Sequence, residues 1–126
     1  IRGLVLWQRT CPDDCMKHKL IRSSVRETIG DFAPAFVGYT EDVLFGDVWR
    51  RSELSLRERS LITVSALVAG EHVNQLPYHL KLAKENGISE EELVEVITQL
   101  AFYVGWPRAA SAIQVAKEVF CKEKES

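Results

Sequence analysis

The chain of 126 residues has no marked excess of charge and no long apolar run. Its 16 Lys and Arg and 18 Asp and Glu residues leave a formal net charge of −2, which excludes the strongly basic surface typical of nucleic-acid binding. The best apolar run, residues 61–69, is interrupted by Thr63 and Ser65 and falls short of the roughly 18 residues that span a bilayer. We therefore expect a cytoplasmic protein that binds neither nucleic acid nor membranes.

Cysteine is also scarce. The chain has three cysteines, Cys11, Cys15 and Cys121, which is an odd number and too few for a disulfide scaffold. Three residues separate Cys11 from Cys15, so the spacing of a thioredoxin-like pair is absent, and His18 alone does not complete a zinc site. We expect reduced thiols and no metal site.

The rest of the composition is that of a globular protein. Apolar residues make up 46% of the chain, too many for a disordered one, and the length suits one domain. The only methionine is Met16. Residues 1–15 are therefore either an authentic N-terminal arm or an extension ahead of a natural start, and residues 16–126 form the predicted domain.

Helical signals begin at Asp31, which is suited to cap a helix that has Pro34 in its first turn. A second helix is predicted from the capping box Ser55–Glu58 to Gly70, and because it is apolar nearly all round, we expect it to be central. The first helix carries apolar residues at roughly helical spacing: Phe32, Phe36, Tyr39, Val43 and Trp49.

Three further helices complete the prediction. One runs from about Asn74 to Asn86 and stops at Gly87, and the next begins at a second capping box, Ser89–Glu92. Its apolar residues follow a regular 3.6-residue period to Val104, and the last helix begins near Pro107. No alternating strand pattern is present. We predict an all-α domain of five to six helices.

Two histidines are the first candidates for chemistry. His72, Gln75 and His79 are spaced i, i+3 and i+7, so they share one face if the helix begins by His72. Imidazole is the commonest general acid or base, but a core histidine and a loop histidine explain the same spacing. Glu58 is explained by its capping role, and Arg59 either holds a substrate carboxylate or lies in solvent. Tyr103 and Trp106 flank the turn before the last helix, where aromatic residues line a pocket or pack in the core.

The chain resembles the carboxymuconolactone decarboxylase family, in its decarboxylase-like branch. The resemblance covers about two-thirds of the sequence and is carried by these segments: Gly46–Arg51, Leu56–Ala69, Gln75–Leu80, Asn86–Leu93, Gln99–Pro107 and Val115–Phe120. It implies an all-α fold, related to alkyl hydroperoxidase D, that assembles into a homotrimer or homohexamer. It also implies loss of CO₂ from a γ-carboxymuconolactone during aromatic-acid catabolism, without a metal ion or organic cofactor.

The same resemblance implies roles for individual residues. His79 aligns with the family's histidine and is the expected proton donor or relay, with Glu58 as its possible orienting partner. Arg59 is the first candidate to bind the carboxylate of a small acidic substrate, with Arg108 behind it. The remaining substrate-binding candidates are His72, Gln75, Gln99, Tyr103 and Trp106.

Two departures limit what the resemblance implies. The alkyl hydroperoxidase D branch uses a glutamate, two cysteines and a histidine, whereas this chain has Ser60, His72 and Gln75 at the first three positions. No thiolate remains there to attack peroxide, so a peroxidase-like function would rest on the fold alone.

Close relatives often carry a histidine where this chain has Gln99, and an amide cannot shuttle a proton. The leading hypothesis is a carboxy-lyase, and the alternative is a non-catalytic oligomeric binding protein.

Overall fold

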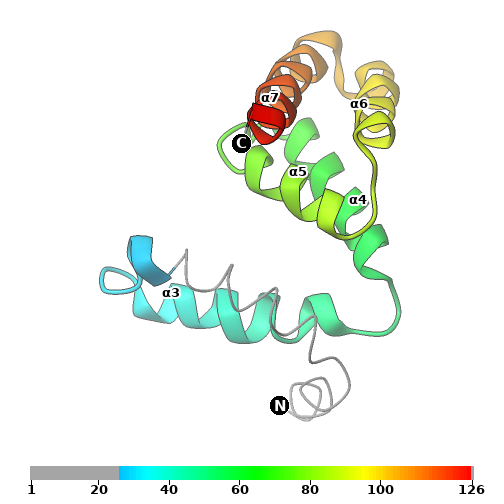
Figure 1. The fold of residues 1–126 in the computed structure, drawn as a ribbon. Helices are drawn as coiled ribbons and strands as arrows, with labels where there is room; N and C mark the ends of the chain where they lie inside the picture. Colours follow the sequence, from blue (N-terminus) through cyan, green and yellow to red (C-terminus); the bar gives the residue numbers. More distant parts are fainter. Residues whose placement is uncertain (1–25, 126) are drawn as a thin grey trace. The chain divides into compact units, whose positions relative to one another are not determined.

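The structure is a computed structural model that describes residues 26–125 (Figure 1). The predicted arm, Met16, His18 and the first two cysteines lie outside these residues. Every regular element between residues 26 and 125 is a helix, so the predicted all-α class is confirmed. The chain divides into two compact units at the boundary between Leu54 and Ser55, and each is described by itself.

The second unit is a bundle of four helices. These are α4 (Leu56–Ala69), α5 (Leu76–Glu85), α6 (Glu90–Val104) and α7 (Trp106–Glu125). Short connections join successive helices (Figure 1). The apolar faces of all four helices meet in one core. The most deeply buried of its large side chains are Val64, Val68, Leu76, Leu80, Ile88, Leu93 and Ile97.

Two capping boxes start helices in this bundle, as predicted. The Ser55 hydroxyl accepts a hydrogen bond from the backbone N–H of Glu58 at 3.1 Å, and the Glu58 carboxylate accepts one from the N–H of Ser55 at 2.8 Å. Ser89 and Glu92 repeat the arrangement at the start of α6. The backbone hydrogen bond from the capping serine lowers the pKa of each glutamate below its ordinary value, which also suits the positive end of the helix dipole.

The end of α5 is fixed by Gly87. The N–H of Gly87 donates to the carbonyl of Lys84 at 3.1 Å, and the N–H of Ile88 donates to the carbonyl of Ala83 at 3.0 Å, which is a Schellman motif. Gly87 has φ +95°, a conformation that a side chain disfavours. Lys84 then joins three helix ends, because its ammonium binds Glu90 at 2.6 Å and Glu123 at 2.5 Å.

The second helix of the prediction, α4, is not enclosed on all sides by the described chain. Its buried residues are Ser60, Val64 and Val68, at i, i+4 and i+8, which is one face. Ile62, on another face, is 56% exposed. The prediction of a central helix is confirmed in that α4 packs against α5, α6 and α7, but these three neighbours leave part of its apolar surface uncovered within the unit.

The first unit departs further from the prediction. Its elements are α3 (Pro34–Gly38), the π-helix η1 (Tyr39–Leu44) and the 3₁₀-helix η2 (Val48–Arg50). Helix α3 begins at Pro34, and its N-cap is Ala33 with no side-chain hydrogen bond. Asp31 is therefore not the cap, since the helix begins three residues beyond it.

The apolar face predicted for this segment is largely exposed. Phe32 is 92% exposed, Phe36 63% and Tyr39 68%, whereas Val37 and Phe45 are buried. Trp49, from the same predicted face, is buried. The π-helix affects only the residues after Gly38, where the N–H of Phe45 donates to the carbonyl five residues back, at 3.0 Å. Such a bond adds a residue to the turn, so from Tyr39 onward the side chains no longer follow the 3.6-residue period on which the prediction relied.

Two glycine substitutions test the backbone assignments. Gly87→Ala should destabilise the protein by about 1 kcal/mol, because alanine is strained at positive φ. Gly38→Ala should stabilise it by about 0.5–1 kcal/mol, since Gly38 has helical φ and ψ of −58° and −46° and an added Cβ meets no atom within 4 Å. Urea unfolding at one fixed protein concentration measures both. Equal effects of the two substitutions would contradict the assignments.

Candidate functional site

The pairing of α4 with α5 determines which candidate residues lie near one another. The Asn86 side-chain amide donates a hydrogen bond to the buried Ser60 hydroxyl at 2.9 Å, so the end of α5 lies beside the start of α4. Both helices rise 1.5 Å per residue, so the separation along the helix axes is about 12 Å between His79 and Arg59. Between His79 and Ala69 it is only about 3 Å. Glu58 and Arg59 therefore lie at one end of the hairpin, and His79 lies nearer the other.

That other end is the turn between α4 and α5, and Arg108 lies against it. The guanidinium of Arg108, in the first turns of α7, donates to the carbonyl of Ala69 at 2.7 Å and has Glu71 4.0 Å away. A positively charged arginine side chain near the last carbonyls of a helix stabilises that helix, because it bonds these carbonyls and faces the negative end of the helix dipole. This end of the bundle thus brings together the α4–α5 turn and the start of α7.

The His72 side chain also belongs to this turn. Its ring lies so close to Gly70 that an added Cβ there would meet the ring atoms Cδ2 and Nε2 at 2.6 Å. Glu71, between them, has φ +57°, which is uncommon for a residue other than glycine. The turn therefore holds the imidazole of His72 over the end of α4, with the side chain exposed.

The predicted single helical face of His72, Gln75 and His79 does not form. Helix α5 begins at Leu76, with Gln75 as its N-cap, so only His79 is helical. Pro77 explains the late start, because proline is tolerated in the first turn but clashes with the carbonyl four residues back inside a helix. The three side chains are still close in sequence, but the turn rather than helical periodicity positions His72.

His79 is a strongly perturbed titratable group at this end. Its side chain is partly buried, and its ring packs edge-on against Tyr78 with 4.9 Å between ring centroids. Burial lowers the pKa of His79 from 6.5 to about 4, so the imidazole is neutral at pH 7. Burial also raises the pKa of Tyr78. A neutral imidazole and a phenol are therefore adjacent in a poorly solvated environment.

The other predicted residues are distributed over three surfaces. Glu58 is exposed and engaged in its capping box. Gln99 lines a hollow of about 260 Å³ between α4 and α6, together with Arg57 and Glu92, which form an ion pair. At the α6–α7 turn, Tyr103 is 80% exposed and Trp106 63%. These three surfaces do not form one enclosed site within the described part of the chain.

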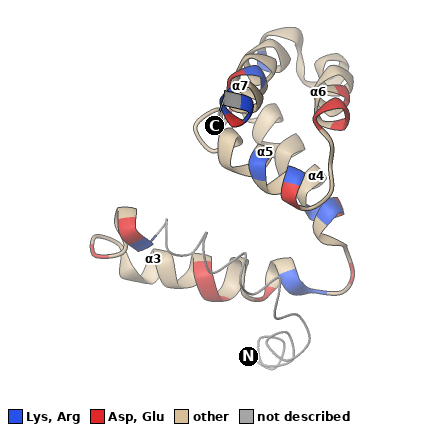
Figure 2. Cartoon of the chain, in the orientation of Figure 1, with Lys and Arg blue, Asp and Glu red and all other residues tan. Residues whose placement is uncertain are grey.

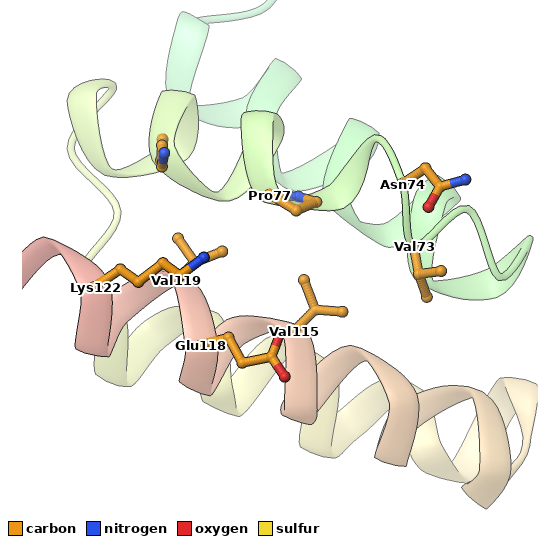
Figure 3. A pocket seen from close by; sticks show the side chains of 8 residues that line it. Val73, Asn74, Pro77, Val115, Glu118, Val119 and Lys122 are labelled. Atoms are coloured by element: carbon orange, nitrogen blue, oxygen red, sulfur yellow. The ribbon is translucent and has the colours of Figure 1, made fainter.

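A hollow that the sequence did not indicate lies between α5 and α7. It has a volume of about 350 Å³, and its aliphatic side chains come from both helices and from the residues before α5 (Figure 3). The lining residues of α7 are spaced i, i+3, i+4 and i+7 from Val115, so they share one face of the helix. Its lining residues are Val73, Asn74, Pro77, Lys81, Val115, Glu118, Val119 and Lys122.

Three further observations concern metal ions, membranes and the free cysteine. Among residues 26–125, no group of three or more His, Cys, Asp or Glu side chains is arranged to hold a metal ion. None of the described helices has the length and apolar character needed to cross a membrane. Cys121 is an exposed free thiol.

Comparison with known proteins identifies the family of this chain. Residues 34–118 match the carboxymuconolactone decarboxylase family. The chain belongs to this family. It is 34% identical over 94 residues to the 4-carboxymuconolactone decarboxylase of Acinetobacter baylyi, an alignment that covers 75% of this chain and 70% of that one.

More distant members of the family differ in what they act on. The nitrosuccinic acid decarboxylase of Metarhizium robertsii is 31% identical over 74 residues, which cover 59% of this chain and 52% of that protein. An uncharacterized 15.0 kDa protein of Paracoccus denitrificans is 29% identical over 86 residues, covering 67% and 64%. Both named relatives are decarboxylases, and their substrates differ.

The lowered pKa of His79 predicts how stability depends on pH. Between about pH 6.5 and 4 the unfolded chain takes up a proton on this residue and the folded chain does not, so the free energy of unfolding should fall as the pH falls. The full loss attributable to His79 is about 3 kcal/mol. Urea unfolding from pH 4 to 8 should show this loss in the wild type and in His72→Asn, and less of it in His79→Asn. Parallel curves for the wild type and His79→Asn would contradict a buried, neutral His79.

Proposed function

We propose that the protein is a cofactor-independent carboxy-lyase that acts on a small carboxylated lactone such as γ-carboxymuconolactone. The observation that carries the proposal is the partly buried, neutral His79 near the turn against which Arg108 lies. The family and its decarboxylase relatives support the reaction class. The substrate is inferred from the first of those relatives.

The reaction requires charge to move out of a carboxylate and a proton to reach carbon. The bond from the ring carbon to the carboxylate breaks, CO₂ leaves, and the electron pair passes into the conjugated lactone carbonyl. A proton then bonds to carbon, so the balance is one carboxylate and one proton consumed for one CO₂ released. A poorly solvated site assists this step, because it replaces the water around the carboxylate by protein groups.

His79 is suited to deliver that proton as a relay. A neutral imidazole donates the proton of one ring nitrogen and regains one from water on the other. An anionic substrate beside it raises the pKa of the imidazole, because a neighbouring negative charge favours the protonated form. The pKa of about 4 in the free protein therefore rises as the substrate binds.

Arg108 is the preferred residue for the substrate carboxylate, in place of Arg59. A guanidinium pairs with a carboxylate through two parallel hydrogen bonds. Arg108 is exposed and contacts Ala69, which is close to the level of His79, whereas Arg59 is about 12 Å away along the hairpin. The carboxylate of Glu71 lies 4.0 Å from the Arg108 guanidinium, and this exposed partner is displaced by a substrate more easily than a buried one.

Kinetics of single variants test these roles. His79→Asn should lower kcat for γ-carboxymuconolactone by about 100-fold or more, the usual contribution of a positioned proton donor. Arg108→Gln should raise KM by about tenfold or more, through loss of a charge-assisted hydrogen bond. Arg59→Gln, at the other end of the hairpin, is the matched control and should change KM less. Loss of substrate absorbance measures all four proteins, and absence of turnover by the wild type would exclude this substrate.

A second candidate function is binding without turnover, and Gln99 is the observation that favours it. Gln99 is an exposed amide in the α4–α6 hollow, where close relatives are expected to carry a histidine that can transfer a proton. If the proposed reaction depends on that missing group, Gln99→His should increase turnover by at least about tenfold, with Gln99→Asn as the control. Substrate binding without conversion by the wild type and by Gln99→His would favour the binding protein.

A further inference from the structure

The hollow between α5 and α7 takes no part in the proposed function, and we call it the α5–α7 hollow. Its volume of about 350 Å³ is at the small end of the range of ligand pockets, which is about 300–1,000 Å³. At roughly 30 Å³ for each water-sized group, it has room for a molecule of about ten non-hydrogen atoms. A small organic ligand therefore fits it.

The α5–α7 hollow lies on the side of α5 opposite to His79. Pro77 and Lys81 line it. His79 is two residues from each of them, which is about 200° around a helix of 3.6 residues per turn. The body of α5 therefore separates the hollow from the imidazole of the candidate site, so a ligand in the hollow does not occupy the position proposed for the substrate.

The floor of the hollow is aliphatic. Val115 and Val119 lie on the side of α7 that faces α5, and Pro77 lies on the facing side of α5 (Figure 3). Val119 is buried, and Val115 packs against the core. Val73, which is 38% exposed, opens the floor to solvent beside the α4–α5 turn. A compact apolar group that covers this floor removes these side chains from water, which is favourable.

Two lysines border the aliphatic floor, Lys81 on α5 and Lys122 on α7. Both are exposed, and neither forms an ion pair within the described part of the chain, whereas Lys84 is paired with two glutamates. With Glu118, the lining has an excess of one positive charge. Both signs of charge are mixed in the C-terminal half of α7 (Figure 2), so this excess belongs to the hollow rather than to the helix.

We propose that the α5–α7 hollow binds a small carboxylic acid with a compact apolar body, in its anionic form. The apolar body covers the aliphatic floor, and the carboxylate accepts hydrogen bonds from the ammonium groups of Lys81 and Lys122. Such bonds between ionised groups are stronger than those between neutral groups. A cationic ligand would instead meet two like charges and one partner, Glu118. This site is additional to the one proposed for the substrate and does not rest on the proposed function.

Titration of the full chain with cyclohexanecarboxylate, at fixed pH and ionic strength, tests the site. NMR of the isotope-labelled protein should show saturable shifts of the methyl signals of Val73, Val115 and Val119, with a Kd on the order of 1 mM for so small a ligand. Cyclohexanecarboxamide has the same shape without the charge, and acetate has the charge without the apolar body. Each should bind at least about tenfold more weakly.

Substitutions of the charged lining residues should act in opposite directions. Lys81→Gln and Lys122→Gln should each weaken binding of cyclohexanecarboxylate by about threefold, the usual effect of losing an exposed ion pair, and the double substitution by about tenfold. Glu118→Gln should strengthen binding by about threefold, because it removes the negative charge of the lining. Lys117→Gln is the matched control, since Lys117 is exposed on α7 outside the hollow, and it should leave binding unchanged. Circular dichroism verifies that all variants fold.

Each other outcome overturns the inference. Absence of saturable shifts excludes the site, and shifts confined to His72, His79 and Arg108 place the acid in the candidate site instead. Equal affinity for the amide or for acetate contradicts the assigned ligand class, and unchanged binding by the double lysine variant contradicts the role of the lysines. Nuclear Overhauser contacts from the Val115 methyls to another protein segment, before the acid is added, would mean that this segment fills the hollow. None of these measurements depends on turnover, so they remain valid if the proposed reaction is absent.

Discussion

The pairing of α4 with α5 is the constraint on which the candidate site depends. Burial of the apolar faces of these helices holds them together, and the hydrogen bond from the Asn86 amide to the buried Ser60 hydroxyl specifies their register. Buried polar groups are costly unless they are paired, so a register that separated these two would be disfavoured. The same register places His79 near the α4–α5 turn and leaves Arg59 at the far end of the hairpin.

The chemistry proposed for His79 follows from desolvation rather than from a charged partner. Burial is the cause of its lowered pKa, and His79 shares a helix face with the buried Leu76 and Ala83, three residues before it and four after it. Helix packing thus keeps the imidazole neutral, while the positive charge that we propose for binding an acidic substrate is that of Arg108, at the start of another helix. Stability and function share the same packing at this point.

Two apolar regions of the chain are exposed. Phe32 and Phe36 come before the π-helix of the first unit, and Phe102 and Tyr103 lie on a face of α6 other than the one that carries its buried residues. The exposure of these side chains is therefore set neither by the π-helix nor by the turn at Gly105, which has φ +102°. Exposed apolar surfaces of this kind are unfavourable in isolation.

The sequence by itself determined the local features. Both capping boxes, the stop at Gly87 and the period of α6 were predictable, because each depends on residues within one or two turns. The family also followed from sequence, and with it the identity of His79 as a candidate. Only the tertiary structure decided which side chains meet. The hairpin register placed His79 near the α4–α5 turn, against which Arg108 lies, and away from Arg59, since contacts between residues distant in sequence depend on how whole helices pack.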